Sequence, residues 1–132
     1  MSEKKRILIV DDEPDFSMIV QTYLEKEGFA TELAYNGVEG FEKIKANPPD
    51  AIVLDVMMPE MDGYELCSAL KKNNTYANIP VVLLTAVADR VTSTKYTHYD
   101  GMSTEADDYL PKPASADDIT QSVKRLLGIQ TA

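Results

Sequence analysis

Apolar and polar positions alternate along the chain in blocks that predict strands and helices in turn. Residues 7–10, 51–54 and 81–84 are short runs of Ile, Val, Leu and Ala, and runs of this kind are typical of buried parallel strands. Residues 30–34 instead alternate apolar and polar side chains, which predicts a strand with one wetter face near the edge of a sheet.

Between these runs, apolar residues recur at the three- and four-residue spacing of helices. We predict helices over residues 14–27, after Asn36-Gly37, over 64–72 and after Ser115, which is placed to cap the last one. Gly28 is expected to end the first helix in a left-handed conformation. The apolar faces expected to be buried comprise Phe16, Ile19, Val20, Tyr23 and Leu24; Val38, Phe41 and Ile44; Leu66, Ala69 and Leu70; and Ile119, Val123, Leu126 and Leu127.

Strands that alternate with helices indicate an α/β fold with a doubly wound parallel sheet, right-handed crossovers and helices on both faces. The 132 residues fit a single domain. A hydrophobic fraction of 44% and a charged fraction of 27% are those of an ordinary globular protein with a packed core.

The chain is acidic, with 13 basic and 22 acidic residues and a net charge of −9. This surplus opposes direct binding to nucleic acid or to an anionic membrane surface, and favours a basic partner or a cation. The single cysteine, Cys67, cannot form an internal disulfide, and the first residues do not resemble a signal peptide. No apolar run approaches the roughly 20 residues needed to span a bilayer. We therefore expect a cytoplasmic protein without membrane insertion.

Each of the three buried runs is followed by a residue that can do chemistry. Asp11 and Asp12 follow the first, Asp55 the second and Thr85 the third. Ligands of open α/β sheets bind beyond the carboxyl ends of the strands, so these side chains are expected to share one site. Neighbouring carboxylates repel one another unless a divalent cation lies between them.

Mg²⁺ suits such a pocket, because it prefers oxygen ligands and commonly takes one or two carboxylates together with phosphate oxygens. A phosphoryl group is then the natural substrate. A carboxylate can accept it as a nucleophile, which gives an aspartyl phosphate.

Four motifs in order give the chain a family resemblance. They are Val10-Asp11-Asp12-Glu13, Leu54-Asp55-Val56-Met57-Met58-Pro59 with Met61-Asp62-Gly63, Leu84-Thr85-Ala86, and Asp107-Asp108-Tyr109-Leu110-Pro111-Lys112-Pro113. From about residue 5 to 127 the sequence resembles the receiver domain of two-component response regulators. The resemblance implies a flavodoxin-like sheet of five parallel strands in the order 2-1-3-4-5.

The resemblance also implies roles for individual residues. Asp55 would be the phosphoacceptor, and Mg²⁺ would be held by Asp12, Asp55 and the backbone carbonyl of Met57, with Asp11 acting mainly through a metal-bound water. Thr85 and Lys112 would contact the phosphoryl oxygens. Tyr109 would then rotate inward, and this movement would alter the surface around the fourth helix, fifth strand and fifth helix. The Lys112-Pro113 bond resembles the family's cis peptide.

Each of these residues also has a structural interpretation. Asp11 and Asp12 can cap the helix that starts at Pro14. Thr85 can be a turn residue at a strand end. Lys112 can be a solvated loop lysine, and Tyr109 a static core aromatic.

The stretch between Thr85 and Lys112 departs from the family pattern, because it is longer than usual by about one helical turn. Residues 91–99 are rich in β-branched, aromatic and hydroxyl side chains and lack an amphipathic stripe. Glu105 stands where the family commonly has glycine. We expect residues 88–105 to form an irregular or flexible fourth-helix segment that alters output coupling and leaves the acceptor chemistry intact.

The expected function is a phosphorylation-controlled switch rather than an enzyme, with catalysis limited to its own phosphorylation and dephosphorylation. Expected partners are a histidine kinase or phosphotransfer protein, a downstream protein or effector domain, and, for a phosphorylation-linked dimer, a second copy. The sequence leaves open whether the chain acts alone or is a piece of a longer protein.

Two other functions remain as alternatives. One is a receiver-like interaction module that works without phosphorylation, although such modules usually lose an acidic or lysine position. The other is an aspartyl phosphatase or mutase, but these generally need a second acid where this chain has Met57. Nucleotide binding is not indicated, because neither G-x-G-x-x-G nor G-x-x-x-x-G-K-[ST] follows any predicted strand.

Overall fold

A computed structural model of the chain describes residues 4–56, 63–85, 106–111 and 114–129. Strands and helices alternate along this part of the chain, as the hydrophobic pattern predicted. The elements are β1 (Arg6–Val10), α1 (Pro14–Lys26), β2 (Ala30–Ala34), α2 (Gly37–Ala46), β3 (Ala51–Asp55), α3 (Gly63–Lys71), β4 (Val81–Thr85), β5 (Asp108–Pro111) and α6 (Ala116–Leu126).

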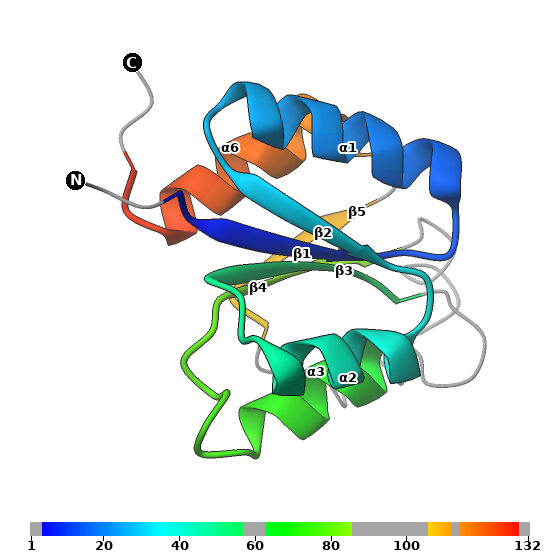
Figure 1. Ribbon diagram of the computed structural model, residues 1–132, viewed down its shortest axis with the longest axis vertical. Coiled ribbons are helices and arrows are strands. Elements are labelled where there is room, and N and C mark those ends of the chain that lie inside the picture. The colour runs from blue at the N-terminus through cyan, green and yellow to red at the C-terminus, as the bar shows by residue number, and fades with distance from the viewer. Residues whose placement is uncertain (1–3, 57–62, 86–105, 112–113, 130–132) are drawn as a thin grey trace.

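The five strands form one parallel sheet in the order β2-β1-β3-β4-β5. This confirms the doubly wound fold and the predicted strand order. Helices α1 and α6 cover one face of the sheet, and α2 and α3 cover the other (Figure 1). β2 is an edge strand, as its alternating sequence predicted.

The three central strands are buried on both faces, which explains why their sequences are almost continuously apolar. Side chains alternate between two hydrophobic clusters along each strand. In β1, for example, Ile7 and Ile9 pack with the α1 and α6 side chains, whereas Leu8 and Val10 pack with those of α2 and α3. Each such side chain contributes about 1.5 to 3 kcal/mol when it is fully buried.

Two helix faces differ from the prediction. Ile19 and Tyr23 of α1 are 52% and 44% exposed, and the side chains that α1 buries are those of Ser17, Val20 and Leu24. In α2, Val38 is 48% exposed while Ile44 is buried. The periodicity predicted both helices correctly, but it assigned exposed apolar residues to their buried faces. Apolar side chains are common on protein surfaces, so an apolar stripe does not by itself define which residues are buried.

The predicted helix ends are confirmed at two positions. Ser115 caps α6, and its side chain accepts a hydrogen bond from the Asp118 backbone N–H at 2.9 Å. Gly28 follows α1 with φ of +94°, a conformation that glycine adopts without the steric cost of a side chain. The third helix begins at Gly63, one residue earlier than predicted.

The predicted irregular segment, residues 88–105, lies outside the described residues. Within the described ranges, no helix combines the length and the apolar character that a membrane span requires.

Candidate functional site

The carboxyl ends of β1 and β3 bring their acidic residues to one edge of the sheet. The parallel pairing of Val10 with Leu54 places the next residues of each strand, Asp11 and Asp55, side by side in register. The Asp11 backbone N–H donates to the Ala34 carbonyl at 3.0 Å, which extends the ladder between β1 and β2 to this position. The backbone of the site is therefore held by the pairing of β1 with both of its neighbouring strands.

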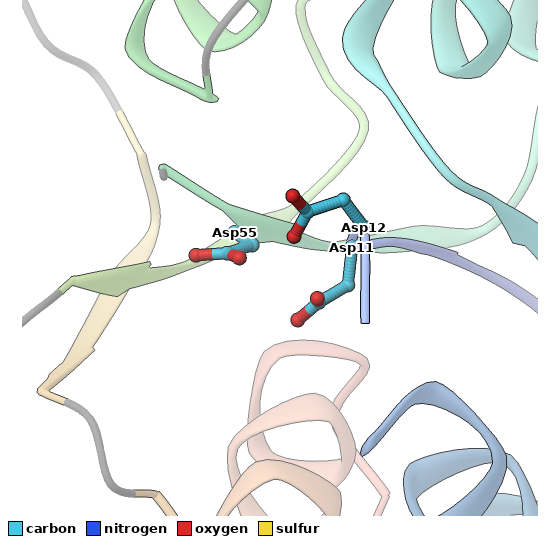
Figure 2. Close-up of side chains that lie close together, drawn as sticks. All are labelled: Asp11, Asp12 and Asp55. Atoms are coloured by element: carbon cyan, nitrogen blue, oxygen red, sulfur yellow. The ribbon is translucent and has the colours of Figure 1, made fainter. Parts of the chain in front are cut away.

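The carboxylates of Asp11, Asp12 and Asp55 converge as the sequence predicted. One oxygen from each lies within 4.8 Å of the others. Figure 2 shows Asp11 and Asp12 extending to opposite sides of the end of β1, with Asp55 next to them. Asp11 and Asp55 are buried, at 0% and 1% exposure, whereas Asp12 is exposed. The group thus has two shielded carboxylates and one that faces solvent.

Such a group is costly without a cation. Two full charges within 4.8 Å of each other repel by at least about 3 kcal/mol at an effective dielectric constant of about 20. A divalent cation between the carboxylates would replace this repulsion with attraction. A set of oxygen donors with one solvent-exposed side fits Mg²⁺, which keeps several waters. The three residues therefore meet the chemical requirements of a metal site.

Asp11 also shapes the local backbone. Its Oδ1 accepts a hydrogen bond from the Glu13 backbone N–H at 2.9 Å, which turns the chain from β1 into α1. The N-cap residue of α1 is Glu13, whose side chain makes no capping hydrogen bond, and Pro14 occupies the first turn. Asp11 thus belongs to the acidic group and also makes a structural hydrogen bond to the backbone. Asp12 does not cap α1.

Thr85 and Tyr109 lie on adjacent strands. Thr85 is the last residue of β4 and is 9% exposed; Tyr109 in β5 pairs in register with Leu83 and is 42% exposed. Because side chains alternate along a strand, Leu83, Thr85 and Tyr109 lie on the same face of the sheet. The exposure of Tyr109 shows that it is not a buried core aromatic.

Two predicted site residues, Met57 and Lys112, lie outside the described residues. The described site therefore consists of Asp11, Asp12, Asp55 and Thr85 at the carboxyl ends of three strands, with Tyr109 on the neighbouring edge strand.

Comparison with known proteins identifies the class to which this fold and acidic site belong. The family model described as response regulator receiver domain matches residues 7–124. The chain therefore belongs to the response regulator receiver domain family.

Relatives of known name agree with this assignment. The response regulator MprA of Mycobacterium ulcerans is 40% identical over 125 residues, which cover 92% of this chain and 50% of MprA. The MprA of Mycobacterium avium is 39% identical with the same coverage. The chain thus spans about half the length of the curated relatives it matches.

Solved structures share the fold closely. The signal receiver domain of a signal transduction histidine kinase from Syntrophus aciditrophicus has a TM-score of 0.83 and 37% identity, covering 97% of this chain and 94% of that one. A putative response regulator from Chloroflexus aurantiacus has a TM-score of 0.81 and 31% identity, covering 96% and 99%.

Proposed function

We propose that this protein accepts a phosphoryl group on Asp55 from a histidine kinase or a phosphotransfer protein, in a reaction that requires Mg²⁺, and that phosphorylation switches the surface near β5 and α6. The observation that carries the proposal is the buried Asp55 carboxylate, grouped with those of Asp11 and Asp12 within 4.8 Å. Membership of the receiver family adds the chemistry for which such a group is used.

In the transfer step, an Asp55 carboxylate oxygen forms a bond to phosphorus as the bond between phosphorus and the donor nitrogen breaks, and the donor imidazole leaves and takes up a proton. Bound Mg²⁺, held by Asp12, Asp55 and the Met57 carbonyl and through water by Asp11, would supply positive charge to the phosphoryl oxygens. The burial of Asp55 keeps bulk water away from the nucleophile. Thr85 and Lys112 would contact the transferred group.

The consequence of phosphorylation is a change of conformation. The Thr85 hydroxyl would turn toward the phosphoryl oxygen, and Tyr109 would turn inward behind it, since both lie on one face of the sheet. Phosphorylation would then cover a ring that is 42% exposed in the structure. Beyond its own phosphorylation and dephosphorylation, we assign no catalytic activity to the domain.

The partners follow from the same proposal. The chain spans about half of the MprA response regulators, so in a longer protein a downstream effector domain would receive the signal; a separate downstream protein is the alternative. A phosphorylation-linked dimer would use the surface that changes. We place the protein in the cytoplasm, where kinases of this kind present their phosphohistidine.

A module that works without phosphorylation is not favoured, because the carboxylates of its acidic group would repel one another and no phosphoryl chemistry would make use of them.

The test is to incubate the protein with a small phosphodonor such as acetyl phosphate, with and without Mg²⁺, and to locate the adduct by mass spectrometry. We expect one adduct on Asp55 that needs Mg²⁺ and is lost in Asp55→Asn. An unmodified Asp55 under conditions that modify other receivers would reject the proposal.

A further inference from the structure

Within the described residues, β5 has four residues against five in each other strand, and it lies at an edge of the sheet next to β4. Its position nevertheless sets the geometry of the switch, since Tyr109 pairs in register with Leu83, two residues before Thr85. A short edge strand has few ladder hydrogen bonds, and its position depends on what else holds it.

One side of β5 is held by α6 through Asp108. Oδ2 of Asp108 accepts hydrogen bonds from the Ser122 hydroxyl and from the Arg125 guanidinium, and Oδ1 accepts from the Tyr109 backbone N–H at 2.9 Å. The Asp108 side chain is 23% exposed, and Ser122 is buried. Hydrogen bonds to an ionised carboxylate are about twice as strong as neutral ones. Arg125 is 63% exposed, so solvent screens its contact, whereas the bond from Ser122 is shielded.

The other side of β5 is held by α3 through the preceding residue, Asp107. Oδ2 of Asp107 accepts from the Lys71 ammonium at 3.0 Å and from the Val81 backbone N–H at 2.8 Å, while the Asp107 backbone N–H donates to the Val81 carbonyl. The Lys71 side chain is 7% exposed. Two adjacent acids therefore tie the start of β5 to helices on opposite faces of the sheet.

The contacts of Asp107 and Asp108 hold the backbone of β5 and do not include the ring of Tyr109. Asp108 and Leu110 face α6, where Leu110 packs against the α1 and α6 cluster. Tyr109 lies between them in sequence, so its ring projects from the opposite face. The Asp108 carboxylate can thus fix the Tyr109 backbone N–H while the side chain turns about its own bonds.

We infer that Asp107 and Asp108, with Lys71, Ser122 and Arg125, form a β5 clamp that positions Tyr109 for the switch. The inference rests on the proposed function, because it concerns how occupancy of Asp55 is converted into a ring movement. With the strand fixed, a change at Thr85 is accommodated by rotation of the Tyr109 ring. With the strand loosened, the strand itself shifts and the ring position no longer follows occupancy.

The contacts between Asp108 and α6 can be tested with matched variants. Arg125 and Lys124 are neighbours in the last turn of α6, and each makes an ion pair, Arg125 with Asp108 and Lys124 with Glu27 of the chain just after α1. Arg125→Met removes the clamp contact, whereas Lys124→Met removes an ion pair of the same helix that does not touch β5. Ser122→Ala removes the second donor to Asp108.

The readout is the position of the Tyr109 ring at full occupancy of Asp55. The protein is labelled with 3-fluorotyrosine, and the Tyr109 signal among the seven tyrosines is assigned with Tyr109→Phe. Mg²⁺ and beryllofluoride, a phosphoryl mimic, are added to saturation, and fluorine NMR reports both the bound mimic and the ring. The wild type and Lys124→Met are expected to convert fully.

Arg125→Met and Ser122→Ala are expected to bind the mimic as fully as the wild type, yet with the ratio of shifted to unshifted Tyr109 about fivefold lower. A loss of stability alone would not produce this separation of occupancy from ring position. Full conversion in both variants, or an equal deficit in Lys124→Met, would overturn the inference. A wild type that takes up no mimic at Asp55 would instead overturn the proposed function, and the inference with it.

Discussion

The ammonium group of Lys71 lies 3.0 Å from Oδ2 of Asp107, although 36 residues separate them in sequence. The same ammonium donates to the carbonyls of Ala77 and Ile79 at 3.0 and 2.8 Å, so its three donors are all used. One buried lysine thus joins the end of α3, the irregular connection to β4 and the start of β5.

Replacing this lysine should destabilise the protein. Lys71→Met keeps the length of the side chain but takes this donor from the carbonyls of Ala77 and Ile79, and leaves Oδ2 of Asp107 with the Val81 backbone N–H alone of its two printed donors. We expect the free energy of unfolding to fall by about 2 kcal/mol, measured by urea denaturation. The control is Lys72→Met at the exposed neighbouring position, which should change stability by less than about 0.5 kcal/mol. Equal effects of the two substitutions would show that the buried contacts contribute little.

Gly40 is constrained by packing. A Cβ atom at this position of α2 would lie 3.0 and 3.2 Å from the two methyl groups of Val10. Alanine gains about 1 kcal/mol in helix propensity, but overpacking costs about 1 to 3 kcal/mol. We expect Gly40→Ala to lower the free energy of unfolding by about 1 kcal/mol. In a Val10→Ala background the added methyl group should instead be neutral or stabilising, and a stabilising effect in the wild type would contradict this account.

The cap of α6 offers a test of a local contact. Ser115→Ala removes the side-chain acceptor for the Asp118 backbone N–H and should lower the free energy of unfolding by about 1 kcal/mol. Ser115→Asp restores an acceptor and adds a negative charge at the positive end of the helix dipole. Thermal or urea unfolding should therefore rank the aspartate variant with the wild type; if it ranks with the alanine variant, the capping bond is not the source of the effect.

The acidic group gives opposite predictions with and without a cation. Asp12→Asn removes one charge from the group, so it should weaken Mg²⁺ binding about tenfold in isothermal titration calorimetry. Without Mg²⁺ the same substitution should raise the free energy of unfolding, because the remaining carboxylates repel less. Asp15→Asn is the matched control, since it removes one exposed charge from the first turn of α1 without entering the group.

The carboxyl ends of the strands could be predicted from sequence because each buried strand stops at a polar residue. A run of apolar residues fixes where a parallel strand lies, and the sheet then brings Asp11, Asp12 and Asp55 together. The buried face of α1 could not be predicted with the same accuracy. Ile19 and Tyr23 continue the apolar stripe, but no described neighbour covers them fully, whereas the buried Ser17 carries no hydrophobic signal.

The contacts of Asp107 and Asp108 were also missed. Both residues belong to a motif shared with the family, but their partners Lys71, Ser122 and Arg125 lie 14 to 36 residues away in sequence. No local periodicity reports which side chain a carboxylate will meet across the sheet. The fold must be known before such a clamp can be found.

The central claim is that the carboxylates at the ends of β1 and β3 hold Mg²⁺ beside a reactive oxygen of Asp55. A crystal structure with Mg²⁺ and beryllofluoride tests it most directly. We predict beryllofluoride on an Asp55 oxygen, and the metal at about 2.1 Å from oxygens of Asp12 and Asp55. A metal bound away from these side chains, or a mimic bound elsewhere than on Asp55, would contradict the account.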